Sequence, residues 1–156
     1  MIGGLDAFAL INPAGCTCLD IGASTGGFTE VLLDRGAMRV VALDVGRDQL
    51  HSSLSGDPRV VVMDGVNARD LTPEMLRVTP GLPDLIVCDA SFISLAKLLP
   101  AALALAPPGA GLLALIKPQF EVGRGNVGKG GVVRDVTLHA QTIARVEQWL
   151  ANEMGW

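Results

Sequence analysis

Two polar residues, Asp89 and Lys117, each follow an apolar run that is typical of a buried strand. The runs are Asp84–Cys88 and Leu112–Ile116. Neighbouring parallel strands lie about 4.8 Å apart, so side chains at their carboxyl ends can meet. A lysine at the end of a buried strand is costly unless its charge is paired. We predict that Asp89 orients Lys117, and that Lys117 helps to deprotonate or stabilise an attacking hydroxyl; the alternative is a purely structural ion pair.

The segment Cys18–Thr29 combines an apolar strand, a turn of small residues and the start of an amphipathic helix. Glycines allow a sharp turn and a close approach of a ligand to the backbone, and the new helix offers free N–H groups. The pattern D-x-G-x-x-x-G-G differs from the dinucleotide fingerprint G-x-G-x-x-G, because an acid precedes the first glycine. That acid would face a cation, which favours S-adenosylmethionine (SAM), with its ammonium and sulfonium groups. A plain strand–helix turn is the alternative.

Further cofactor contacts are expected at the ends of other strands. Asp44 lies 22 positions after Gly22 and ends a strand, where an acid can accept hydrogen bonds from ribose hydroxyls; the alternative is an N-cap of the next helix. Asp64 and Asn67 could bind the adenine amino group, or could be ordinary polar loop residues. The complete predicted cofactor set is Asp20, Gly22, Ala23, Ser24, Gly26, Gly27, Phe28, Asp44, Val45, Asp64, Asn67 and Asp89.

The loop Gln119–Arg134 is rich in glycine and carries three cations, Arg124, Lys129 and Arg134. Its one acid is Glu121. A flexible backbone with cations suits a phosphate-rich substrate such as RNA, so these three residues and Lys117 are predicted substrate contacts. The alternative is an ordinary solvated loop.

Composition narrows the classes of function. The 156 residues are the length of one domain, and the formal net charge of −4 excludes a uniformly basic nucleic-acid-binding surface. The odd count of three cysteines, without paired metal-ligand spacing, predicts reduced thiols in a cytoplasmic protein and no metal site. Prolines and glycines interrupt the apolar stretch 101–116, so no membrane span is expected.

The elements that must position these residues alternate between strand and helix. Strands are predicted at Thr17–Ile21, Arg39–Leu43, Arg59–Met63, Asp84–Cys88 and Leu112–Ile116. Helices are predicted at Gly27–Asp34, Arg47–Leu54, Pro73–Val78, Ser94–Leu105 and Val136–Glu153, the last with Asp135 as N-cap and with Ile143, Val146 and Leu150 on one face. This alternation predicts an α/β fold with a doubly wound, mainly parallel sheet, in which ligands bind beyond the carboxyl ends of the strands.

Several motifs together resemble one family. They are the glycine-rich segment 18–29, Ala42–Gly46, Asp57–Val60, Asp89–Leu95 (D-A-S-F-I-S-L), Ile116–Glu121 (I-K-P-Q-F-E) and Val127–Asp135. The combination is similar to the TlyA, or haemolysin A, family of FtsJ/RrmJ-like ribosomal RNA methyltransferases. The resemblance covers the chain from about Leu5 to the last helix.

The resemblance implies a Rossmann-like methyltransferase that uses SAM to methylate a ribose 2′-hydroxyl of ribosomal RNA, either free or in ribosomal subunits. The family's catalytic set is Lys–Asp–Lys–Glu; Asp89 matches the aspartate and Lys117 the second lysine, whereas the first lysine and the glutamate have no match here. We therefore expect one methyltransferase domain over residues 1–156. An N-terminal S4-type RNA-binding domain and the last strands of the sheet are expected to lie outside this chain.

Three other functions are considered. The two unmatched catalytic positions allow a non-catalytic module that binds SAM or RNA. A membrane-active haemolysin would need a spanning segment, a secretion signal or a basic amphipathic helix, and the sequence shows none. The spacing of the glycine-rich segment argues against a nicotinamide-dependent oxidoreductase.

Overall fold

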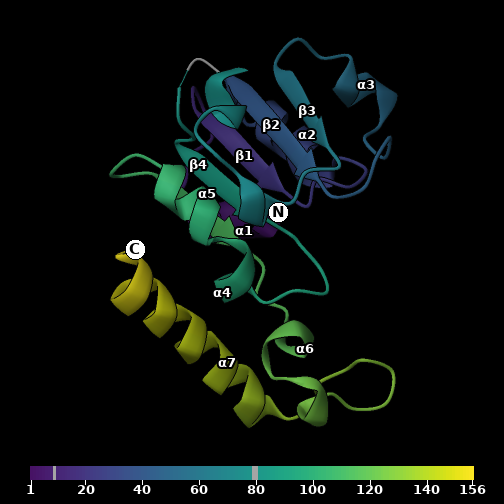
Figure 1. The fold of residues 1–156 in the computed structure, drawn as a ribbon, viewed down its shortest axis with the longest axis vertical. Helices are drawn as coiled ribbons and strands as arrows, with labels where there is room; N and C mark the ends of the chain where they lie inside the picture. The colour runs from purple at the N-terminus through teal and green to yellow at the C-terminus, as the bar shows by residue number, and fades with distance from the viewer. Residues whose placement is uncertain (9, 79–80) are drawn as a thin grey trace.

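Five parallel strands form one sheet in the computed structural model, which describes residues 1–8, 10–78 and 81–156. Their order across the sheet is β3-β2-β1-β4-β5 (Figure 1). The strands are β1 (Thr17–Ile21), β2 (Arg39–Asp44), β3 (Val60–Asp64), β4 (Leu85–Cys88) and β5 (Gly111–Ala114). Nearly continuous apolar runs form these strands because both faces of a parallel sheet are covered.

The register of the strands brings their carboxyl ends to a single edge. Ile21 pairs with Leu43 on one side and with Cys88 on the other, and Cys88 pairs with Ala114. The residues that come directly after Ile21, Leu43 and Cys88 therefore lie side by side at one edge of the sheet. They are Gly22, Asp44 and Asp89.

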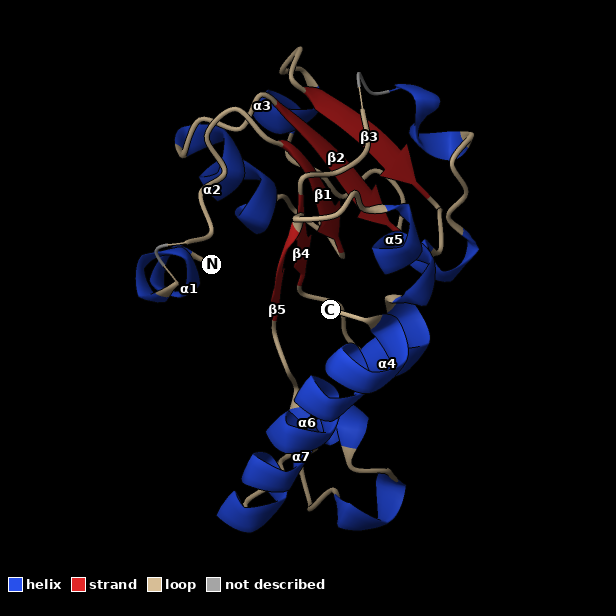
Figure 2. Ribbon diagram, turned by 90° about the vertical axis from the view of Figure 1, so that its left-hand side faces the viewer, coloured by secondary structure: helices blue, strands red, loops and turns tan. Residues whose placement is uncertain are grey.

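Helices cover both faces of the sheet (Figure 2). One face carries α1 (Ile2–Ala7), α2 (Gly27–Asp34) and α3 (Ser52–Ser55); the other carries α4 (Leu95–Leu98), α5 (Pro100–Leu105) and α7 (Val136–Trp149). Alternate strand residues face alternate sides: Cys18 packs in the cluster of α2, whereas Leu19 packs in the cluster of α5. The predicted doubly wound α/β fold is confirmed.

Short helices link these elements. The α-helix α6 (Pro118–Glu121) follows β5, and 3-10 turns form η1 (Ala68–Asp70), η2 (Met75–Val78) and η3 (Arg124–Asn126). A π-helical turn, η4 (Leu150–Met154), continues α7. No helix within the described ranges is both long and apolar enough to cross a membrane.

Several predicted elements differ from the structure, and the last helix, predicted over Val136–Glu153, divides into α7 and the π-helical turn η4. The helix predicted over Arg47–Leu54 begins only at Ser52, because Asp48 has a left-handed backbone with φ of 55°. The helix predicted over Pro73–Val78 is the 3-10 turn η2. The helix predicted over Ser94–Leu105 divides into α4 and α5, since Pro100 lacks the N–H that a continuous helix needs and instead opens α5.

In addition, β5 ends at Ala114 and not at Ile116, so Lys117 lies three residues beyond the strand. Ile143, Val146 and Leu150 were predicted on one face of the last helix, but burial within α7 is centred beside Ile143. Ile143 is 45% exposed, whereas Thr142 is buried with Val146, one helical turn away. Burial of Thr142 is tolerated because its hydroxyl donates a hydrogen bond to the carbonyl of Leu138 at 2.7 Å. Asp135 is the predicted N-cap, with Oδ1 accepting the N–H of Thr137.

Candidate active site

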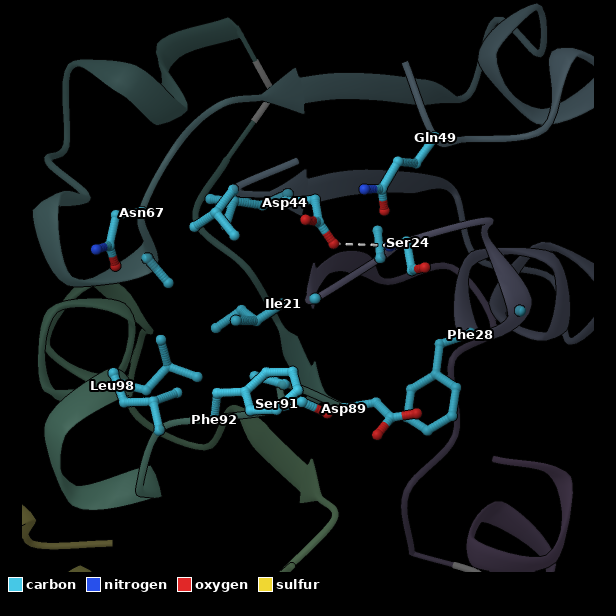
Figure 3. A pocket seen from close by; sticks show the side chains of 18 of the residues that line it. Ile21, Ser24, Phe28, Asp44, Gln49, Asn67, Asp89, Ser91, Phe92 and Leu98 are labelled. Atoms are coloured by element: carbon cyan, nitrogen blue, oxygen red, sulfur yellow. Dashed lines mark hydrogen bonds between the residues drawn. The ribbon is translucent and has the colours of Figure 1, made fainter. Parts of the chain in front are cut away.

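A pocket of about 700 Å³ opens at the carboxyl edge of the sheet (Figure 3). Its walls come from the loops after β1, β2 and β4, from the start of α2 and from Lys117. The pocket therefore lies where the strand order reverses, between β1 and β4, which is the usual ligand position in open parallel sheets.

The floor of the pocket is the glycine turn after β1. Gly22 has φ of 83°, and a Cβ there would lie 3.1 Å from the Cα of Ala90. The N–H groups of Gly22 and Ala23 both donate to the carbonyl of Leu43, at 2.9 and 3.1 Å. Gly26 has φ of 103° and caps α2, and a side chain there would collide with Leu54. Only glycine fits the turn at both positions without strain.

Asp44 ties two loops together at one side of the pocket. Its Oδ2 accepts the N–H of Ser24 at 2.8 Å, drawn as the dashed line in Figure 3. Its Oδ1 accepts the N–H of Gly46 at 2.7 Å. Each carboxylate oxygen has a second lone pair, so Asp44 can still accept a ligand hydroxyl. Gln49 lines the same wall and adds an amide donor.

Asp20 does not line the pocket, although the sequence predicts that it contacts the cofactor. Its side chain is completely buried on the α2 side of the sheet, where the hydroxyl of Thr29 donates to Oδ2 at 2.7 Å. Its Oδ1 has no hydrogen-bond partner among the described residues. Burial raises the pKa of Asp20 from 3.8 to about 6, although the hydrogen bond from Thr29 acts in the opposite direction.

Only one of the two residues predicted to bind adenine lines the pocket. Asn67 lines the pocket, and its Oδ1 accepts the N–H of Arg69 at 3.1 Å, which leaves its amide N–H groups to donate to a ligand. Asp64 is not part of the lining; its Oδ2 accepts the N–H of Asp48 in the loop after β2. Among the other predicted contacts, Gly22, Ala23, Ser24, Gly27, Phe28, Asp44, Val45 and Asp89 line the pocket and Gly26 does not.

Asp89 and Lys117 meet at the pocket, as their strand positions predict. Lys117 Nζ lies 2.5 Å from Asp89 Oδ1, 2.9 Å from Ser91 Oγ and 3.3 Å from the Asp89 carbonyl. The two charged side chains are 24% and 36% exposed, so the ion pair is partly shielded from water. The neighbouring thiol of Cys88 is not a thiolate nucleophile at neutral pH, because burial raises its pKa to about 11.

Gln49, Ser91 and Phe92 are among the pocket residues that the sequence did not predict. Phe92 has φ of 68° and is 90% exposed, with its ring centroid 5.2 Å from that of Phe120. A left-handed phenylalanine is strained, and such strain gathers at functional sites. Phe92 could have been predicted as a pocket residue, because it is an aromatic residue that closely follows Asp89 and Ser91. No sequence pattern marks Gln49.

The predicted RNA-contacting loop lies outside the pocket. Lys129 and Arg134 are exposed, in the irregular segment between η3 and α7. The side chain of Arg124 lies outside the part of the chain that the structure describes. Within the described residues, no group of three or more His, Cys, Asp or Glu could hold a metal ion.

Comparison with a protein-family model identifies the family of this chain. The FtsJ-like methyltransferase model matches residues 1–155. The chain belongs to the FtsJ-like methyltransferase family. Its glycine turn, Asp44 and the Asp89–Lys117 pair are therefore parts of an FtsJ-like methyltransferase fold.

Relatives within this family carry ribosomal RNA methyltransferase names. The chain is 57% identical over 156 residues to the 16S/23S rRNA (cytidine-2′-O)-methyltransferase TlyA of Mycobacterium tuberculosis, covering 100% of this chain and 56% of that protein. It is 42% identical over 141 residues to the 23S rRNA (cytidine-2′-O)-methyltransferase TlyA of Campylobacter jejuni, covering 89% of this chain and 52% of that protein. The FtsJ-like chain thus spans about half the length of these curated relatives.

Solved structures share the fold of this chain. A structure from Streptococcus thermophilus that bears a hemolysin name has a TM-score of 0.89 and 40% identity, covering 98% of this chain and 56% of that one. An O-methyltransferase from Bacillus cereus has a TM-score of 0.64 at 23% identity, covering 97% of this chain and 70% of that one. The second likeness shows a shared fold alone, which is the Rossmann-like fold predicted from the sequence.

Proposed function

We propose that this chain is the methyl-transfer domain of a SAM-dependent enzyme that methylates a ribose 2′-hydroxyl of ribosomal RNA. Membership of the FtsJ-like family and the names of the relatives support this function. The observation that carries it is the Lys117–Asp89 pair at a pocket whose opposite wall is built around Asp44.

The residues of the pocket fit SAM. Asp44 and Gln49 would hold the ribose hydroxyls, and the Asn67 amide would donate to a ring nitrogen of adenine. The close approach allowed by Gly22 would let the backbone of the turn hold the methionine part. When bound, SAM supplies an electrophilic methyl group.

Lys117 and Asp89 would act on the attacking hydroxyl. The ammonium group of Lys117 stabilises negative charge that develops on the ribose oxygen, and this effect is strongest where water is excluded. Asp89 and Ser91 hold the Lys117 Nζ in place, at 2.5 and 2.9 Å. A hydroxyl held beside the methyl group reacts faster because the approach is already oriented.

Substrate contacts extend beyond the pocket. The exposed ring of Phe92 offers a surface on which a nucleotide base can stack. Lys129 and Arg134, with Arg124, provide cations for phosphates on a chain whose net charge is otherwise negative. An RNA substrate of this kind would place the protein in the cytoplasm with ribosomal RNA or ribosomal subunits as its partner.

Transfer of radioactive methyl groups from SAM tests this function. Purified protein containing this chain is incubated with deproteinised ribosomal RNA and, separately, with isolated ribosomal subunits. Complete nuclease digestion should then yield a labelled 2′-O-methyl nucleoside. Label on a base, or no label with a protein that binds S-adenosylhomocysteine, would overturn the proposal.

A further inference from the structure

Two segments that are distant in sequence contact each other at successive points beside the pocket. One is the loop after β4, residues 89–95, and the other is the 117–121 segment, which begins with Lys117 and includes α6. Lys117 contacts Asp89 and Ser91, and three residues later the ring of Phe120 packs against that of Phe92. The order of contacts is the same along both segments.

Glu121 makes the last of these contacts. Its Oε1 accepts the N–H of Leu95 at 2.8 Å, although the two residues are 26 positions apart. Leu95 is the first residue of α4, and the N-cap residue Ser94 makes no capping hydrogen bond through its side chain. Because the first N–H groups of a helix have no partner within it, Glu121 supplies an acceptor that α4 itself lacks.

We propose that Glu121 is a positioning residue for methyl transfer. It anchors the end of the 89–95 loop to α6 and thereby fixes where Asp89, Ser91 and Phe92 lie. This inference rests on the proposed function, because the groups that it positions are the ones assigned to the hydroxyl and the base. Glu121 does not line the pocket, so its role is to position other residues rather than to bind the cofactor.

A residue of α7 in turn contacts the backbone of Glu121. The guanidinium of Arg145 donates through Nη2 to the carbonyl of Glu121 at 2.9 Å. Figure 1 shows α6 beside the lower part of α7, and Figure 2 shows both below the sheet. The loop after β4 is therefore connected to α7 through one short helix. A shift of about 1 Å at the reacting groups can cost on the order of 100-fold in rate.

A positioning role for Glu121 predicts different effects for two substitutions. Glu121→Gln keeps an oxygen that can accept the Leu95 N–H, whereas Glu121→Ala removes the acceptor. A positioning role predicts that Glu121→Ala lowers kcat for RNA methylation by about 10-fold or more while KM for SAM changes little, and that Glu121→Gln restores most of the rate. Glu147→Ala, at an exposed position on α7, is the matched control.

Amide hydrogen exchange provides a readout that is independent of activity. The Leu95 amide should exchange slowly in the parent chain and in Glu121→Gln, and much faster in Glu121→Ala. Amide signals of Ser91 and Phe92 should shift in Glu121→Ala alone. Calorimetry with S-adenosylhomocysteine should give similar affinities for all variants, which shows that they are folded.

The outcomes distinguish the two proposals. If the parent protein transfers no methyl group to ribosomal RNA, the proposed function fails, and the amide signals still test the anchor. If the parent is active and Glu121→Ala keeps its full kcat, or leaves the exchange of Leu95 unchanged, the role of Glu121 is wrong. Equal losses in Glu121→Ala and Glu121→Gln would also overturn it.

Discussion

Lys117 Nζ lies 2.5 Å from Asp89 Oδ1, although the two residues are 28 positions apart in the chain. Their strands, β4 and β5, are neighbours, but β5 ends at Ala114. The three residues after Ala114 carry the backbone past the edge of the sheet, and the long lysine side chain returns to the end of β4. The ammonium group is thus held at the pocket by partners on one loop.

The first prediction concerns Lys117. Lys117→Met removes the ammonium group but keeps much of the side-chain volume. Because this charge is assigned to the developing oxyanion, methyl transfer to RNA should fall by about 100-fold or more. Affinity for S-adenosylhomocysteine, measured by calorimetry, should change by less than about threefold. The reason is that the Lys117 charge is assigned to the transition state and not to binding of the cofactor.

Lys97→Met is the matched control for this experiment, since Lys97 is an exposed lysine of α4. Its rate should equal that of the parent protein. Retention of full activity in Lys117→Met would remove Lys117 from the mechanism and leave the ion pair as a structural feature.

The second prediction concerns the pH dependence of stability at Asp20. Its pKa of about 6 in the folded chain lies above the ordinary value of 3.8, because the carboxyl group is buried. The folded state therefore binds a proton more tightly than the unfolded state. The stabilisation is complete below about pH 3.8 and is lost as pH rises to about 6, by at most about 3 kcal/mol.

Asp20→Asn removes this titration but keeps an acceptor for the Thr29 hydroxyl. Denaturant unfolding at several pH values should show that the free energy of unfolding falls between pH 4 and 6 more steeply for the parent than for Asp20→Asn. Parallel curves for the two proteins would mean that Asp20 does not titrate in this range.

The third prediction compares two glycines of the same turn. Gly22→Ala forces an alanine to adopt φ of 83° and brings its Cβ against the backbone of Ala90, so it should destabilise the fold by about 1–3 kcal/mol. A Cβ added at Gly27, in α2, would meet no atom of another described element within 4 Å. Gly27→Ala should therefore be neutral or stabilise by about 0.5–1 kcal/mol. Thermal unfolding measures both, and an equally stable Gly22→Ala would contradict the geometry.

The fourth prediction concerns the exposed loop cations. The double variant Lys129→Gln/Arg134→Gln should weaken RNA binding and reduce the slope of log K against log salt by about one to two. Affinity for S-adenosylhomocysteine should not change, because neither residue lines the pocket. An unchanged salt slope would show that the loop does not contact phosphates.

The positions of the strands could be predicted because apolar runs end at polar residues, as at Asp44 and Asp89. The side of the sheet to which the Asp20 side chain points could also be predicted. Residues alternate along β1, and this alternation places Cys18 and Asp20 on the α2 side. The glycine-rich motif instead favoured a cofactor contact at Asp20. In the structure the buried Asp20 side chain accepts a hydrogen bond from Thr29 of α2.

Other features depend on tertiary contacts that no local pattern shows. Gln49 reaches the pocket because the loop after β2 turns at Asp48, whose N–H is held by Asp64. Phe92 is exposed through a left-handed backbone that phenylalanine rarely adopts. The capping role of Glu121 requires a residue 26 positions away, and sequence periodicity carries no such information.

Calorimetric titration with S-adenosylhomocysteine tests the central claim most directly, because Asp44 is assigned to the cofactor ribose and also holds the amides of Ser24 and Gly46. The parent chain should bind one equivalent, and Asp44→Ala should bind at least about 10-fold more weakly. NADH should not bind to either protein. A folded parent chain that does not bind S-adenosylhomocysteine, or an Asp44→Ala variant with unchanged affinity, would contradict the account.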